Sequence, residues 1–267
     1  MPLLDFLKLP ETRGIVSMDD VETTALHREI ILRKPFLKRM YDDFYREIRA
    51  AVEPVEGKTL IELGSGGGFM KEIIPTVITS DIKELPWVDR RISALDMPLD
   101  DASVDAFLLF NVLHHIPDVR RFFREAQRCL KPGGRIVMIE PTNTPWSKFV
   151  YQTFHHEPFV PGAAWEFPST GPMSSGNDAM PWIVFVRDRR VRTRVPCARH
   201  HAHPPPYPLP PPGKRRRVHA CHCPLMVIRL CEVRRDHADP AHAPVRHVHD
   251  GGSAEISCRT AARDLDD

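Results

Sequence analysis

The sequence predicts an α/β fold, with a mostly parallel sheet and helices on both of its faces. Residues 60–63 form a short, mostly apolar run that includes Glu62 and reads as a buried strand. Residues 106–110 form a continuous apolar run, as expected for a strand buried on both sides of a parallel sheet. From Val119 to Leu130, apolar residues recur at helical spacing with arginines between them. Strands followed by amphipathic helices are typical of an α/β sheet.

The first apolar run leads directly into a glycine loop. Gly64, Gly66 and Gly68 permit positive φ and let the backbone approach a ligand, and Glu62 is expected at the carboxyl end of the strand, where open α/β sheets bind ligands. The dinucleotide fingerprint needs a glycine at its sixth position, and Phe69 stands there instead. A Gly-rich turn without any ligand is the alternative.

A second run, residues 77–81, closes on an acid. The two carboxylate oxygens of Asp81 can accept hydrogen bonds from both hydroxyls of a ribose. We expect a short helix over residues 69–74 between the two strands. Further on, Asp96 precedes a predicted turn at residues 100–105, and it either contacts a ligand or bonds its own backbone.

The strand at residues 106–110 ends in Asn-Val-Leu-His-His, residues 111–115. Asp118 is a natural N-cap for the next helix, and Lys-Pro-Gly-Gly at residues 131–134 should end it. Residues 135–141 then form a further predicted strand, which Pro141 ends.

Together, the motifs of residues 58–141 resemble the class I S-adenosylmethionine-dependent methyltransferases of the small-molecule type. The resemblance implies a Rossmann-like sheet and S-adenosylmethionine as cofactor, with Asp81 at the ribose, Ile82 against the adenine face and Asp96 at the adenine edge. The sheet of that family ends in an antiparallel strand pair, which we expect to be missing here. The cofactor-binding residues implied are Glu62, Gly64, Ser65, Gly66, Gly68, Asp81, Ile82, Asp96, Met97 and Asn111.

We expect four regions along the chain. An N-terminal helical cap (1–57) precedes the cofactor-binding core (58–141), an aromatic and Pro-rich substrate lid (142–186) and a tail rich in Arg, Pro, His and Cys (187–267). Within the cap, Pro35 and the apolar residues after it predict a helix over residues 35–50. By the resemblance this helix covers cofactor and substrate; alternatively, it only packs on the edge of the sheet.

In the lid, aromatic and imidazole groups stand between prolines, which suits a loop over a pocket better than a helix. The substrate-binding candidates are His155, His156, Glu157 and Trp165. A flap that only packs is the alternative. His155, His156 and Glu157 could suggest a metal, but we expect none, because adjacent residues rarely point at one centre and no partner stands nearby at helical spacing.

The composition changes abruptly after Phe185. All 13 phenylalanines lie at or before it, while five of the 6 cysteines and nine of the 14 histidines lie beyond it. Such a segment buries little apolar surface and is expected to be disordered. We hypothesise that the reading frame is lost near residues 186–190. The alternatives are a natural disordered tail, a nucleic-acid or targeting patch at residues 214–217, or a zinc site formed by Cys221, His222 and Cys223 with Cys231 and nearby histidines. Within residues 224–233, one strand could form at residues 225–228.

We therefore predict methyl transfer from S-adenosylmethionine to an unidentified, small-molecule acceptor. His114 or His115 is the candidate base, although packing or helix capping would also explain either one. Asn-Val-Leu-His differs from the Asn-Pro-Pro-Tyr of enzymes that methylate exocyclic amines of bases, which argues against DNA adenine as the acceptor.

The formal net charge of +2 is too small to favour binding to nucleic acid. The sequence contains no run of eighteen apolar residues that could span a membrane, so we expect a soluble cytoplasmic protein. Oligomeric state is left open. Two other functions remain: a NAD-dependent oxidoreductase that uses the same first strand and Asp81, and a non-catalytic interaction protein that keeps the cofactor fold.

Overall fold

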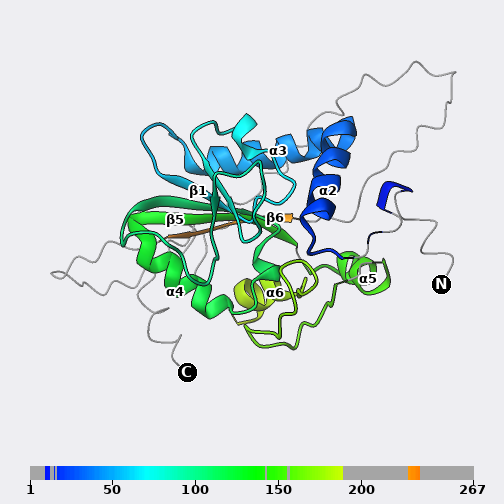
Figure 1. The fold of residues 1–267 in the computed structure, drawn as a ribbon. Helices are drawn as coiled ribbons and strands as arrows, with labels where there is room; N and C mark the ends of the chain where they lie inside the picture. Colours follow the sequence, from blue (N-terminus) through cyan, green and yellow to red (C-terminus); the bar gives the residue numbers. More distant parts are fainter. Residues whose placement is uncertain are drawn as a thin grey trace, which may run out of the picture.

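One six-stranded sheet organises the chain (Figure 1), and the structure, a computed structural model, describes residues 10–12, 15, 17–141, 143–154, 157–188 and 228–234. The strand order is β3-β2-β1-β4-β5-β6. Five strands run parallel, and β6 pairs antiparallel with β5. The strands are β1 (Leu60–Leu63), β2 (Ile78–Asp81), β3 (Arg90–Arg91), β4 (Val104–Phe110), β5 (Leu130–Pro141) and β6 (Ile228–Arg234).

Helices and single turns connect the strands or precede them. The longer helices are α2 (Val21–Arg33), α3 (Pro35–Val52), α4 (Val119–Cys129) and α5 (Pro145–Phe154). The short elements are η1 (Pro10–Thr12), η2 (Met70–Glu72), η3 (Leu113–His115), α6 (Met180–Trp182) and the π-helical turn η4 (Ile183–Arg187). None of the helices among the described residues is long and apolar enough to cross a membrane.

The sheet is the middle layer of three. Helix α3 covers one face, and α4 and α6 cover the other (Figure 1). Successive side chains of a strand point to opposite faces, so Phe107 and Leu109 of β4 join the core beneath α4, while Leu108 and Phe110 join the core beneath α3. This two-sided burial confirms the apolar run that predicted a covered parallel sheet.

Strand β1 lies between β2 and β4. Strands β2 and β3 are added on one side of β1, and β4 and β5 on the other, so the strand order reverses at β1. Open α/β sheets bind ligands at such a switch point, outside the carboxyl ends of the strands. The loops after β1, β2 and β4 therefore meet at one edge of the sheet.

Several local expectations are confirmed. Helix α3 begins at Pro35, as predicted, and ends at Val52. Helix α4 begins after Asp118, whose side-chain Oδ1 accepts a hydrogen bond of 2.8 Å from the backbone N–H of Arg121. A short 3₁₀ turn, η2, lies where a short helix was expected between the first two strands. Helix α2 was not expected; Ile30 and Ile31 are its buried apolar residues.

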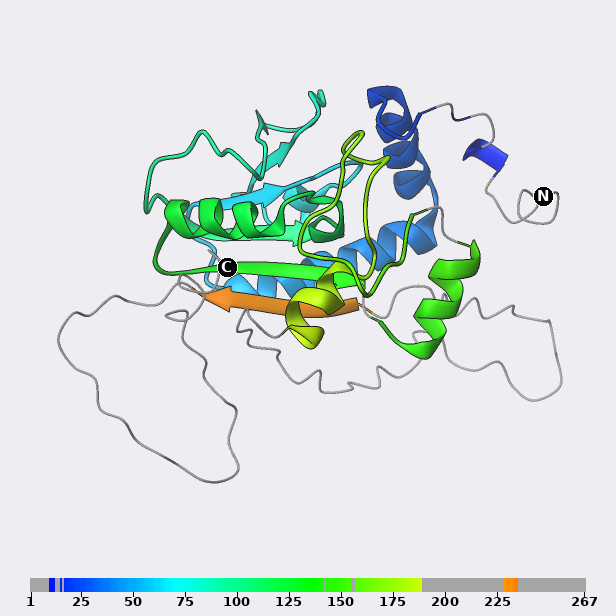
Figure 2. The same cartoon turned by 90° about the horizontal axis from the view of Figure 1, so that it is seen from below.

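Two expectations are wrong. The lid was expected to be a loop, but its first part forms helix α5, because consecutive residues without glycine follow Pro145, which suits a first helical turn. The tail was expected to be disordered and to leave the sheet without antiparallel strands, but Ile228–Arg234 pair with β5 as one antiparallel edge strand (Figure 2). Strand β5 otherwise presents unpaired backbone groups on that side, which β6 satisfies.

The other features proposed for the tail lie outside the described residues. These are the region of the proposed frame loss after residue 188, the basic run at residues 214–217, and Cys221 and Cys223. Strand β6 begins at the last residue of the run 225–228 in which one strand had been considered.

Candidate cofactor and acceptor site

A cavity of about 710 Å³ opens at the carboxyl ends of β1, β2 and β4. Helices α2 and α3 contribute to one wall, and the segment around Met173 contributes to another. Asp19 connects these two parts, because its Oδ1 accepts hydrogen bonds from the backbone N–H groups of Met173 and Ser174 at 2.6 and 3.1 Å. The N-terminal cap and the lid therefore enclose the same space.

The glycine loop has a backbone that other residues would not adopt easily. Gly64 and Gly66 have φ of +68° and +49°, in the left-handed region. A Cβ on Gly68 would come within 2.7 Å of the Ser65 carbonyl oxygen and would also meet the Tyr45 hydroxyl. At Gly66 the nearest atom to such a Cβ is 4.0 Å away. The space beside Gly66 is therefore open to a ligand.

Glu62 is buried at the end of β1 and accepts a hydrogen bond of 2.6 Å from the Ser65 hydroxyl. Burial raises its pKa from 4.5 to about 7, and the nearby charge of Asp81 acts in the same direction, while Ser65 opposes both. The strand end therefore holds a carboxyl group that changes charge near neutral pH.

Asp81 lies at the end of β2, facing the glycine loop. Its Oδ2 accepts from the Gly66 N–H at 2.8 Å, and its Oδ1 accepts from the Lys83 N–H at 2.9 Å. A carboxylate has about four acceptor positions, so these two bonds orient the group and leave room for two hydroxyl donors. Ile82 also lines the cavity, with a side chain 44% exposed.

Asn111, directly after β4, is a non-glycine residue at φ +56°. Its side-chain Oδ1 is buried and has no hydrogen-bond partner among the described residues. It lines the cavity together with Ser65. A residue held in this conformation with an unused acceptor is a reasonable ligand contact.

Two of the residues implied by the resemblance do not reach the cavity. Asp96 is exposed and Met97 is buried in the core, and neither lines the cavity. Ala94 and Leu95 form the wall at this position. The bend between Ser93 and Asp96 turns the acid outward, since these residues form an isolated antiparallel bridge.

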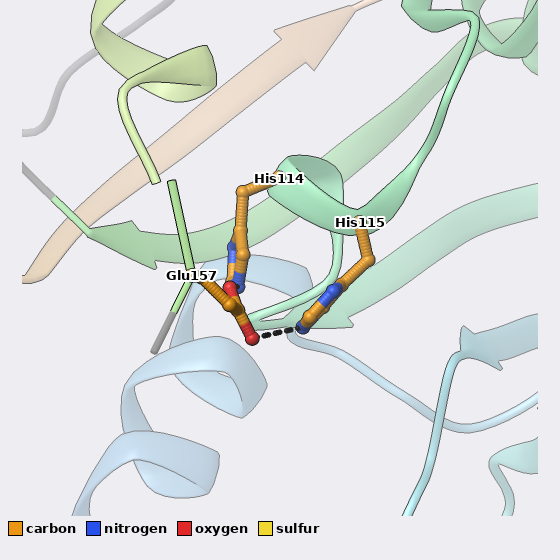
Figure 3. A group of neighbouring side chains, drawn as sticks. All are labelled: His114, His115 and Glu157. Carbon is orange, nitrogen blue, oxygen red and sulfur yellow. Dashed lines mark ion pairs between the residues drawn. The ribbon is translucent and has the colours of Figure 1, made fainter. Parts of the chain in front are cut away.

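The two histidines after β4 lie at the cavity wall beside Glu157 of the lid (Figure 3). His115 Nε2 is 3.6 Å from Glu157 Oε1, and His114 Nε2 is 3.7 Å from Glu157 Oε2. His114 Nδ1 is 2.9 Å from Glu140 Oε2. Burial acts to lower the pKa of His114, but Glu140, Asp178 and Glu157 outweigh it and raise the pKa to about 9.

The remaining lid candidates have different places. Trp165 is buried in the core, does not line the cavity, and donates from Nε1 to Asp188 Oδ2 at 2.8 Å. As a substrate contact it is wrong, because its ring packs beside Phe123. His155 and His156 lie outside the described residues.

Sequence reasoning missed several residues of the site. The Arg28 guanidinium donates to the carbonyls of Gly67 and Gly68 and so holds the glycine loop from α2. Asp178 lines the cavity from the far end of the lid. Neither belongs to a local motif, and Asp178 follows a segment rich in Ser and Gly, in which one acid gives no signal of a site.

The comparisons with known proteins agree with the motifs. Residues 61–138 match the family model described as a methyltransferase domain. The chain is 30% identical over 126 residues to a ubiquinone biosynthesis O-methyltransferase from Paramagnetospirillum magneticum, covering 41% of this chain and 51% of that protein. It is 42% identical over 103 residues to 27-O-demethylrifamycin SV methyltransferase from Amycolatopsis mediterranei, covering 31% and 38% of the two chains.

The chain spans about half the length of the curated relatives it matches, or less. Among solved structures, a SAM-dependent methyltransferase from Aquifex aeolicus overlaps 65% of this chain and 89% of its own, with 16% identity and a TM-score of 0.41. The sheet order, the glycine loop and the sequence match define the same region. Residues 61–138 of this chain are therefore similar to the methyltransferase domain, and S-adenosylmethionine-dependent methyltransferases are among the relatives that match this region.

Proposed function

We propose that the whole chain transfers a methyl group from S-adenosylmethionine to a small-molecule acceptor. The observation that carries this proposal is the open space beside Gly66, bounded by the carboxylate of Asp81. The names of the relatives support the acceptor class, since they refer to quinones and to a rifamycin. Both O- and C-methyltransferases are among them, so the acceptor atom is left open.

The described residues fit the cofactor. Asp81 would accept from the ribose hydroxyls, Ile82 would lie against the adenine face, and Glu62, Asn111 and the glycine loop would surround the amino-acid part. The donor and acceptor groups are already oriented by the backbone, which reduces the cost of ordering them on binding.

When bound, S-adenosylmethionine supplies a sulfonium whose methyl carbon is open to direct displacement. The chain must align the acceptor, exclude water and take up a proton if the acceptor is a hydroxyl. Met173 and the segment that Asp19 holds cover the cavity and serve the second task. His115 lies at the wall and stays a candidate for proton uptake, whereas His114, with its pKa raised to about 9, already holds a proton near neutral pH.

The two alternative functions gain no support. A NAD-dependent oxidoreductase would need the sixth-position glycine that Phe69 replaces. An interaction protein without catalysis would not need a cavity of about 710 Å³ beside the loop. A cytoplasmic location stays a prediction.

Calorimetry with S-adenosylhomocysteine tests the cofactor assignment. Gly66→Val should abolish binding, because a branched side chain would fill the open space and resist a φ of +49°. Gly57→Val is the matched control. Gly57 has a φ of +71°, is exposed and does not line the cavity, so this variant carries similar backbone strain without filling the site. Equal binding by wild type and Gly66→Val would disprove the assignment.

A further inference from the structure

The cluster of His114, His115 and Glu157 has the composition of a metal site. One ligand atom from each residue lies within 4.8 Å of the other two. The histidines belong to η3 and Glu157 belongs to the segment after α5, and Figure 3 shows its carboxylate beside both imidazoles. Two imidazoles and a carboxylate form a ligand set that Zn²⁺ and related divalent ions bind.

The second nitrogen of each imidazole has a suitable partner. His115 Nδ1 is 3.1 Å from the Ser175 carbonyl oxygen, which can only accept, so Nδ1 carries the proton and Nε2 presents a lone pair. His114 Nδ1 is 2.9 Å from Glu140 Oε2, which holds a proton on Nδ1, so that Nε2 presents a lone pair once a metal ion displaces its proton. Metal-binding histidines almost always donate their other N–H to a carboxylate or a carbonyl.

The distances between the presented atoms also suit one shared ion. His115 Nε2 is 3.6 Å from Glu157 Oε1, and His114 Nε2 is 3.7 Å from Oε2 of the same carboxylate. Metal bonds of about 2.1 Å in a tetrahedral arrangement place neighbouring ligand atoms roughly 3.4 Å apart. The observed separations are too long for direct hydrogen bonds. A small movement of these side chains toward one another would bring both imidazole nitrogens and the Glu157 carboxylate within bonding distance of one ion.

Three buried carboxylates surround the two imidazoles. Glu140, Glu157 and Asp178 are each 8% exposed or less, and Asp178 Oδ1 lies 3.8 Å from His114 Nε2. Moving carboxylates out of water is costly unless cations accompany them. The charge of the cluster therefore favours a bound cation.

The lid is held firmly against the cluster. The Asn177 N–H donates to the His114 carbonyl at 2.8 Å, and the Asn177 side chain bonds the backbone of Val160 in both directions. A Cβ on Gly176 would come within 3.0 Å of Glu157 Oε2 and 3.2 Å of His115 Nδ1. The ligand atoms are thus positioned by packing and backbone hydrogen bonds.

We propose that His114, His115 and Glu157 bind one divalent transition-metal ion at the cavity wall, with Glu140 and the Ser175 carbonyl orienting the imidazoles. The expectation of no metal considered only neighbours in the sequence, and the histidines that complete this set are about forty residues from Glu157. All three ligands line the cavity, so a remaining coordination position faces the acceptor. On the proposed function, on which this last point rests, the acceptor class is one with a metal-binding oxygen or nitrogen.

Zinc titration of the full chain tests the site. The chain is first stripped with a chelator and then titrated with Zn²⁺ in competition with a chromophoric chelator. His115→Ala and Glu157→Gln should each weaken the affinity at least about 100-fold, since even the loss of an orienting partner costs roughly 10- to 100-fold. His27→Ala and Glu166→Gln are the matched controls and should retain the wild-type affinity, because neither residue belongs to the cluster.

Cobalt spectroscopy separates this site from the cysteines of the tail. Co²⁺ bound by His and Glu lacks the thiolate charge-transfer bands that cysteine ligands produce, because thiolates are the softer ligands. The bands of a nitrogen and oxygen site should be present in the wild type and absent in His115→Ala. If only thiolate bands appear, or if the wild type and His115→Ala bind zinc equally, the proposal is overturned.

Glu140→Gln keeps the shape of the side chain and tests the orienting role. An amide N–H facing His114 Nδ1 would favour the tautomer with its proton on Nε2, which cannot ligate. Zinc affinity should fall about 10- to 100-fold. An unchanged affinity in folded Glu140→Gln protein would overturn the orienting role.

S-adenosylhomocysteine calorimetry on the same variants separates this proposal from the cofactor assignment. His115→Ala, Glu157→Gln and Glu140→Gln should all retain cofactor-product binding, which also shows that they fold. Loss of zinc binding with retained product binding supports the metal site. Absence of product binding in the wild type would contradict the proposed function and leave the zinc result standing.

Discussion

The cofactor loops and the histidine–carboxylate cluster line the same cavity but are assembled in different ways. Glu62, Gly66 and Asp81 come from two consecutive strand ends, within 20 residues of one another. His114 and Glu157 of the cluster, and Glu140 that contacts His114, come from three separate segments: η3, the lid and β5. The first region depends on local backbone conformation, whereas the second depends on how β4, β5 and the lid pack together.

This difference also determines what each region tolerates. The loops after β1 and β2 keep their shape through glycine conformation and backbone hydrogen bonds, as Gly66 to Asp81 shows. The cluster keeps its shape through buried polar groups that satisfy one another, and removing one partner leaves the others unsatisfied. Substitutions in the cluster should therefore affect stability, while substitutions at the cofactor loops should mainly affect binding.

The largest effect is expected for Glu140→Ala. This change removes the partner of His114 and the acceptor of the Val112 and Leu113 N–H groups, each bonded at 2.8 Å. Breaking a buried charged pair in this way costs about 3–5 kcal/mol of the free energy of unfolding. Urea denaturation measures it, and the exposed Glu166→Ala serves as control. If Glu140→Ala lost no more unfolding free energy than Glu166→Ala, the cluster would not differ from the cofactor loops in its effect on stability.

A pH-dependent effect is expected at Glu62. Its pKa is raised from 4.5 to about 7 in the folded state, so the folded chain holds the proton more tightly than the unfolded chain does. The stabilisation is complete below pH 4.5 and is lost as the pH rises through 7. Relative to Glu62→Gln, the wild type should lose about 3 kcal/mol of unfolding free energy across this window, at about 1.4 kcal/mol per pKa unit.

Denaturation of wild type and Glu62→Gln at several pH values, without ligand, measures this difference. Other carboxyl groups, such as Asp105, have lowered pKa values and change stability in the opposite direction at lower pH, but they are common to both proteins. A constant difference between the two proteins from pH 4 to 8 would contradict the assignment of the effect to Glu62.

A smaller effect, on binding alone, is expected for Asp81→Ala. The change removes the contacts proposed for the ribose hydroxyls and should weaken S-adenosylhomocysteine affinity by roughly 1.5–3 kcal/mol, the scale of hydrogen bonds to a charged group. In the structure, the Asp81 carboxylate accepts hydrogen bonds from two backbone N–H groups near the cavity. Water can take the place of the carboxylate there, so the variant should stay folded. Calorimetry measures the S-adenosylhomocysteine affinity, and a thermal melt measures the stability of the fold. A destabilised variant with unchanged affinity would contradict the prediction.

The smallest effect is expected at the edge of the sheet. Backbone amides of β6 that pair with β5 should exchange more slowly than those of an unpaired chain, but faster than those of the central strand β4. Hydrogen exchange read by mass spectrometry or NMR resolves the difference. Full exchange of Ile228–Arg234 within the dead time of the measurement would restore the expectation that the tail is disordered.

Local sequence was sufficient for the sheet core and the cofactor loops. Apolar runs at residues 60–63 and 106–110, the glycines after the first and Asp118 before α4 each act through the backbone of their own neighbours. Tertiary packing keeps these local conformations, because the strands are covered by the core on both faces of the sheet. The same reasoning failed at Asp96, where the direction of a turn decided whether a carboxylate entered the cavity.

Tertiary structure decided the rest. Trp165, chosen for its aromatic ring, was drawn into the core by the burial of its large apolar surface, while Glu157 was placed beside His115 by the packing of the lid. Strand β6 joined the sheet because β5 offered an unpaired edge. The sequence alone thus determined the fold of the core and the loops proposed to bind the cofactor, since these follow from contiguous residues. Which acids and histidines share one site followed only from contacts between segments distant in the chain.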